Sequence, residues 1–453
     1  MVVNLDNSHS MLTSKDVHVE VRQGADTPDV WLSRDPADTA RPLPEDTPAH
    51  LHHILARLDR DMAHTSIYDA AAMNEIVLRT CYLFFTNRFE WAESTVRRHF
   101  RRSPIFSLAF TTINVMVAVL SWNEADIAES RARAAHTLAL ASAMQPDSSW
   151  FSGGASAPTP SQVEGYVVGA EVSLINAFLH ILEESMLSLA KCGLAVHSGL
   201  KLYGQVDSAL GKAVSSLTAP DGVPAMVIPD RGFRRAAVEV DEAAAQAAGV
   251  ASSMAVPAAM QGEEGDNGSL AGMPPALVSG GLFGMGMFNL ITGSMPDIAL
   301  KVVQFLGYSA SKQAALAQLR ACMLGRSVRG PLAGLGMLIE LVQLPSFLSD
   351  AALRQRCAVD AEEVLGVMFR QFPNSALFLW NAGRAERMRW NLGLADALFA
   401  ECAAIASSSA KFQALANVAA YDRAFCYLFL APGGNELAQE LLTPPATAPD
   451  FLA

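Results

Sequence analysis

DAEEVLGVMFRQFPNSALFLWNAGRAERMRWNLGLADALFAEC, residues 360–402, decides the fold. It contains a small residue, Ala361, followed four positions later by a large residue, Leu365, and twelve positions later by Pro373. Thirty-four residues after Ala361 the pattern returns, with Ala395 as the small residue and Phe399 as the large one. A period of 34 residues is typical of tetratricopeptide repeats, in which each unit is a hairpin of two helices.

Each residue type in this pattern has a physical role in the repeat. The small residue lets two helices approach closely, the large one fills the gap to the next hairpin, and proline ends the second helix. The helix that begins after Pro373 places Leu379, Ala382, Gly383 and Glu386 at the usual positions of a first helix. Residues 360–402 therefore predict one complete hairpin and the second helix of the hairpin before it.

The same spacing recurs far upstream. FEWAESTVRRHFRRSP, residues 89–104, contains Ala92, Val96 and Pro104 at the spacing of Ala361, Leu365 and Pro373. A weaker third copy has Ala438 as its small residue. The sequence thus predicts an all-α protein, a tetratricopeptide-like solenoid of helical hairpins forming an α-α superhelix.

The composition favours helices and argues against a nucleic-acid-binding function. Hydrophobic residues make up 51% of the 453 residues and charged residues 17%, and the alanine- and leucine-rich middle favours helices over strands. A net charge of −12 disfavours binding of nucleic acid through a broad basic face. The six cysteines never form a CxxC motif, which is typical of reduced, buried thiols.

Changes in composition predict the domain boundaries. Residues 1–50, rich in proline and aspartate, are expected to be a disordered tail, and residues 219–276 a flexible Ala/Gly/Pro-rich insertion. Helical repeat halves are expected at 51–218 and 277–442, followed by a tail at 443–453. The first residues lack the long apolar stretch of a secretory signal, so a cytoplasmic location is expected.

Several blocks give the chain a family resemblance. Four blocks resemble sequence blocks of the tetratricopeptide repeat protein 39 family and occur in the same order. They are GMGMFNLITGSMP (284–296), FLGYSASK (305–312), QLRACMLGRSVRGPL (318–332) and FRQFPNSALFLWNAGRAE (369–386). Resemblance to this family implies an adaptor without established catalytic residues. Its fungal relatives are described as inclusion-body-clearance or mitochondrial outer-membrane proteins, and its animal members are linked to protein turnover and lipid handling.

One helix face is a candidate binding site. In the predicted helix 376–391, repeat geometry aims Leu377, Trp380, Arg384 and Arg387 at the concave groove. An aromatic anchor beside two guanidinium groups suits an acidic peptide segment of a protein partner. The alternative is a packed tryptophan beside solvated arginines.

A second arginine pair lies in Gly325-Arg326-Ser327-Val328-Arg329. One interpretation is that Arg326 and Arg329 are exposed and bind an acidic motif or phosphate, with Arg320 nearby. The other is a turn in which Ser327 caps the next helix and the arginines bind carbonyl groups. The sequence leaves both open.

Residues 276–295 carry no charge over twenty residues, enough for a membrane span by length. The competing interpretation is a buried helix whose glycines allow close packing. A peripheral protein of membranes, lipid droplets or the mitochondrial outer membrane that docks through 276–306 is therefore the alternative function, and a nuclear location is a further alternative. Oligomeric state stays open.

Motifs for catalysis are missing from the sequence. It has no HExxH, no GxSxG, and no lysine-serine after the glycines of 280–286. We therefore expect no enzyme activity, no metal ion and no cofactor. The principal hypothesis is a non-enzymatic scaffold that binds another protein.

Overall fold

The computed structural model describes residues 49–64, 70–145, 158–182, 186–210, 275–293, 311–325 and 327–430, with single residues at 45, 47, 436, 438, 439 and 441. All of these belong to one unit, Pro36–Ala453. Within them the regular secondary structure is helical, without a strand. The prediction of an all-α, tetratricopeptide-like protein is confirmed.

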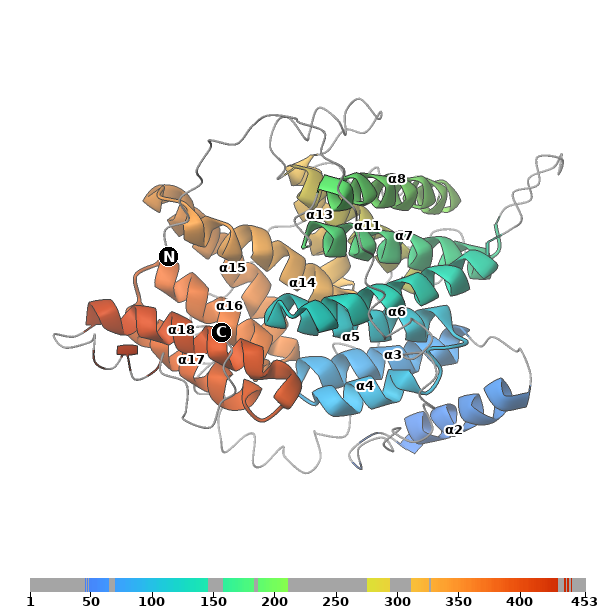
Figure 1. Ribbon diagram of the computed structural model, residues 1–453, viewed down its shortest axis with the longest axis horizontal. Helices are drawn as coiled ribbons and strands as arrows, with labels where there is room; N and C mark the ends of the chain where they lie inside the picture. Colours follow the sequence, from blue (N-terminus) through green and yellow to red (C-terminus); the bar gives the residue numbers. More distant parts are fainter. Residues whose placement is uncertain are drawn as a thin grey trace, which may run out of the picture. The chain divides into compact units, whose positions relative to one another are not determined.

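The helices of the first half are α2 (Ala49–His64), α3 (Ala70–Phe85), α4 (Phe89–Arg97), α5 (Pro104–Ser121), α6 (Glu124–Ala143), α7 (Pro160–Ile181) and α8 (Met186–Ala209). Those of the second half are α11 (Pro275–Gly293), α13 (Lys312–Leu324), α14 (Gly330–Leu338), the π-helix η3 (Ile339–Gln343), the 3-10 helix η4 (Pro345–Phe347), α15 (Ala351–Gln371), α16 (Ala376–Met388), α17 (Leu392–Ala406), the 3-10 helix η5 (Ala410–Phe412) and α18 (Gln413–Leu430). Consecutive helices pack against each other, most extensively in the pairs α5–α6, α7–α8, α16–α17 and α17–α18 (Figure 1).

The hairpins α3–α4 and α16–α17 share one feature of their turns. The turn between the helices contains a residue with left-handed φ in both, Asn87 at 66° and Trp390 at 64°. Each stands five positions before the small residue of the second helix, Ala92 or Ala395. Because few residues other than glycine adopt this conformation, the shared position indicates that the two segments are copies of one structural unit.

Close packing inside the hairpins uses the small residues. Ala92, Ala361 and Ala395 are all fully buried. Gly383 of α16 lies against Phe399 of α17, where an added Cβ would be 2.6 Å from Phe399 Cε1. The two helices of this hairpin touch at a position with no room for a side chain, as repeat packing requires.

The prolines stand at helix boundaries. Pro104 is the first residue of α5, where it needs no amide hydrogen, and the Oγ of Ser103 accepts a hydrogen bond from the Phe106 amide at 3.5 Å. Pro373 follows the C-cap residue of α15, Phe372, and precedes α16. Both prolines therefore separate one hairpin helix from the next.

Contacts join the two predicted halves. The side chain of Asn87 donates to the Asn374 carbonyl at 2.6 Å and accepts from the Ala376 amide at 2.9 Å. It thereby caps α16, whose own N-cap residue makes no side-chain cap bond. Nearby, the Phe89 ring stacks on Phe412 with centroids 3.5 Å apart. The first hairpin thus packs against repeats about three hundred residues away.

Two predicted boundaries were wrong. The apolar spacing predicts one helix over 161–192, but α7 ends at Ile181 and α8 begins at Met186. No proline or glycine marks this break in the sequence, and Gly193 lies inside α8 instead of ending a helix. A helix was also expected over 327–343. There α14 begins only at Gly330 and widens into the π-helix η3 after Leu338.

Candidate functional site

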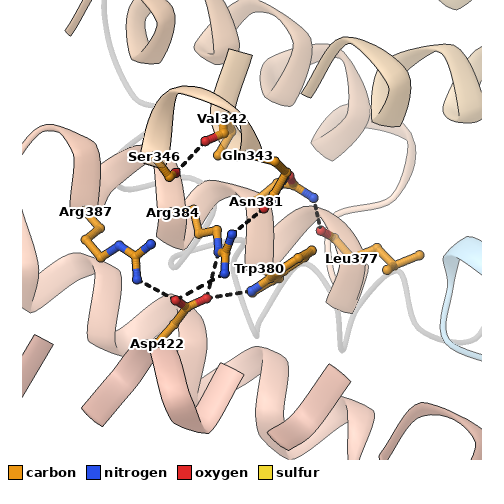
Figure 2. A network of polar contacts seen from close by, with 9 residues as sticks. All are labelled: Val342, Gln343, Ser346, Leu377, Trp380, Asn381, Arg384, Arg387 and Asp422. Atoms are coloured by element: carbon orange, nitrogen blue, oxygen red, sulfur yellow. Dashed lines mark hydrogen bonds and ion pairs between the residues drawn. The ribbon is translucent and has the colours of Figure 1, made fainter. Parts of the chain in front are cut away.

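Three predicted binding residues of α16 converge on one carboxylate, that of Asp422 in α18 (Figure 2). Trp380 Nε1 donates to Asp422 Oδ2 at 2.9 Å, and Arg384 Nε donates to the same oxygen at 2.8 Å. Arg387 binds Asp422 Oδ1 from one turn further along α16. The acidic group that these residues bind in the structure is therefore part of the chain itself.

The network continues into the π-helix η3. Arg384 also donates to the side-chain oxygen of Gln343, whose amide group donates to Asn381 at 2.8 Å. The Arg384 guanidinium lies 4.6 Å from the centroid of the Trp380 ring, which is within reach of a cation–π interaction. Arg384 thus links three elements, α16, η3 and α18 (Figure 2).

The charges at this site do not balance. Two guanidinium groups pair with a single carboxylate, which leaves a net charge of +1. The Asp422 side chain is 1% exposed, whereas those of Arg384 and Arg387 are 12% and 16% exposed. The carboxylate is buried, and each of the two arginine side chains keeps a small exposed area.

The second predicted pair has a different environment. Arg326 lies outside the described residues. Arg329 does not have the exposure that one of the two interpretations requires: its side chain is 5% exposed and forms an ion pair with Glu171 of α7, itself 7% exposed. Arg329 also donates to the Ala276 carbonyl at 3.1 Å, while the neighbouring Arg320 pairs with Glu363 at 2.6 Å.

The buried pair is electrically neutral. Burial raises the pKa of Glu171, and the charge of Arg329 offsets only part of this rise. Burial acts on Arg329 in the opposite sense, but Glu171 raises the pKa of that arginine above its usual value. One positive and one negative charge therefore face each other with little access to water.

A group of polar residues that the sequence analysis missed surrounds this pair. Ser279 of α11 bonds to Ser327 and lies 3.4 Å from the Cys322 sulfur. Tyr203 of α8 is fully buried, and an added Cβ at Gly284 would be 1.8 Å from its hydroxyl oxygen. The glycines of α11 therefore serve close helix packing, which matches the buried-helix interpretation of this segment.

The described residues contain no group of histidine, cysteine or acidic side chains placed to hold a metal ion. Burial raises the pKa of the Cys402 thiol to about 12 and that of Cys322 to about 11. Both thiols are therefore protonated at neutral pH, which makes them weak nucleophiles.

The chain is a tetratricopeptide-like helical-repeat protein. Its hairpins follow a 34-residue period, and a polar helix face lies inside the repeats. The chain belongs to the Iml2/Tetratricopeptide repeat protein 39 family, whose family model matches residues 78–432. The resemblance found in the sequence is thereby confirmed. No solved structure matches the chain. Repeat proteins of this kind are generally non-catalytic and typically mediate protein–protein interaction.

Proposed function

We propose that this protein is a non-enzymatic scaffold that binds an acidic segment of another protein on the face of α16. The observation that carries the proposal is the charge imbalance at Asp422. Arg384 and Arg387 share one carboxylate, so a second carboxylate at their exposed edges would complete two charge-assisted pairs. Asp422 then acts as an internal competitor for the same guanidinium groups.

The test uses the intact chain and a fluorescently labelled peptide of alternating aspartate and glutamate, followed by anisotropy. Asp422→Asn removes the competing charge and should tighten binding by about tenfold, the equivalent of about 1.4 kcal/mol. Asp396→Asn is the matched control, because Asp396 pairs with Arg423 at 2.9 Å on the neighbouring helices. Affinity should fall as salt is added. A folded Asp422→Asn variant that binds no more tightly than the control would overturn the acidic-segment proposal.

Charge reversal is a poor test at this site. Arg384→Glu combined with Arg387→Glu would place two further carboxylates beside that of the buried Asp422, so lost binding could reflect lost folding. Arg387→Gln is the sharper change, because it removes one positive charge, keeps a polar group and leaves Arg384 to neutralise Asp422. It should weaken peptide binding without loss of helicity.

The pair Arg326 and Arg329 is the competing location for an acidic partner. Arg329 would have to leave Glu171 before it bound a ligand. Arg326→Glu alone therefore tests this location without disturbing the buried pair. Loss of peptide binding in Arg326→Glu, with full binding in Arg387→Gln, would move the site to residues 325–329.

Peripheral membrane docking through 276–306 is the alternative function. Pro104–Ser121, Ala276–Gly293 and Gly330–Phe347 are long and apolar enough to cross a membrane, judged by length and composition. However, 61% of the Ala276–Gly293 stretch is buried within the protein, so docking there would need α11 to separate from its neighbours. Flotation of the intact protein with liposomes tests this alternative. Roles in protein turnover, aggregate clearance or lipid handling are proposals that follow from the family resemblance. A cytoplasmic location is a separate proposal.

A further inference from the structure

An apolar cavity lies between α3, α5, α7 and the start of α14, away from the α16 face. It encloses about 610 Å³ of space, counting the part open to solvent. Its wall includes Val77 and Phe84 from α3, Ala109 and Met116 from α5, and Leu332 from α14.

The polar groups in the wall already have partners in the chain. Thr80 donates to the Ile76 carbonyl at 3.0 Å and Thr112 to the Leu108 carbonyl at 2.9 Å. The Cys81 thiol lies 3.3 Å from the Val328 carbonyl oxygen. Because these groups are satisfied, a polar ligand would lose its hydrogen bonds to water on entering and gain few in return.

The charged residues that line the cavity are Glu171 and Arg329, the buried ion pair. An anionic ligand would have to displace Glu171 from Arg329, and a cationic one would have to displace Arg329 from Glu171. A neutral ligand leaves the pair intact. A hydroxyl on such a ligand could donate to the Glu171 carboxylate or accept from the Arg329 guanidinium.

We propose that this cavity binds a neutral, mainly aliphatic small molecule with at most one hydroxyl group, whose alkyl part lies against α3 and α5. Both the apolar wall and the neutral ion pair are needed for this specificity. The wall selects for alkyl groups, and the pair selects against charge. The site is independent of the proposed protein-binding face.

Isothermal titration of the intact chain with octan-1-ol, and in parallel with octanoate at pH 7.5, tests the proposal. The two probes share one alkyl length and differ in charge. Octan-1-ol should bind saturably. Octanoate should bind at least about tenfold more weakly, because its carboxylate must compete with Glu171 for Arg329. Octanoate binding as tight as octan-1-ol, or no saturable heat with octan-1-ol, would overturn the proposal.

A pair of variants locates the binding. Ala109→Phe places a ring in the cavity and should weaken octan-1-ol binding by about tenfold or more. The ring takes the space of the alkyl chain, and the close-packed surroundings cannot move aside to hold both. Ala139→Phe makes the same change at an exposed position of α6 and should leave the affinity within about twofold of wild type. Equal affinities in the two variants, both shown to be helical, would place binding outside this cavity.

Discussion

The two arginine sites differ in charge balance and in access to solvent. Arg329 meets one carboxylate, and both side chains are almost fully buried. Arg384 and Arg387 share one carboxylate and keep edges at the surface. Arginine pairs at both places suggested binding. Among the described residues, Arg329 has a balanced charge, whereas Arg384 and Arg387 together do not. Charge balance and exposure together therefore distinguish Arg329, which forms a buried ion pair, from the α16 pair, where we propose that a partner binds.

The largest effect should come from breaking the balanced pair. Arg329→Met leaves Glu171 buried without its counterion and should lower the free energy of unfolding by about 3–5 kcal/mol. The double variant Glu171→Leu/Arg329→Met removes both charges and should recover most of this loss, since a buried pair can often be replaced by apolar side chains. Urea denaturation followed by circular dichroism measures both. A single variant as stable as the double variant would show that Glu171 does not need Arg329.

A smaller loss is expected at α16. Asp422→Asn removes the shared carboxylate and should lower the free energy of unfolding by about 1–3 kcal/mol. The loss stays below that of Arg329→Met because the Arg384 and Arg387 side chains are more exposed than that of Arg329. Asp396→Asn, in a more exposed pair, should cost about 0–1 kcal/mol. An Asp422→Asn loss equal to that of Arg329→Met would remove the proposed distinction between the two sites.

The hairpins were predictable because their information is local. Ala361, Leu365 and Pro373 lie within thirteen residues of one another, and each acts through a property of its own: size, or the loss of a backbone donor. Local spacing likewise predicts that Trp380, Arg384 and Arg387 lie on one face of α16. Spacing in a helix fixes which side chains share a face, so this grouping needed no knowledge of the rest of the chain.

The partners of those residues were not predictable, because they depend on tertiary packing. Glu171 lies 158 positions from Arg329, and Asn87 lies 289 positions from the amide it caps at Ala376. Nothing in the sequence around Arg329 distinguishes a guanidinium that meets a buried glutamate from one that meets solvent. Local spacing could identify the candidate arginines but not their charge balance.

The pH dependence of stability tests the assignment of Glu171 directly. Burial raises the pKa of Glu171, and Arg329 offsets part of the rise. In Arg329→Met that offset is gone, so the pKa rises further. The folded state then holds a proton that the unfolded state releases above the ordinary glutamate pKa. Stability must therefore fall as pH rises through the interval between the two values, by at most about 1.4 kcal/mol per pH unit.

Urea denaturation of Arg329→Met between pH 5 and pH 8 should thus show a loss of stability with rising pH, relative to the double variant Glu171→Leu/Arg329→Met. Other carboxylates titrate in both proteins, and the comparison cancels their contribution. Wild type should show a weaker dependence of the same sign, because Arg329 keeps the Glu171 pKa closer to its usual range. Parallel pH profiles for the single and double variants would mean that Glu171 is solvated once Arg329 is removed. The site would then resemble the α16 face, whose charges reach water.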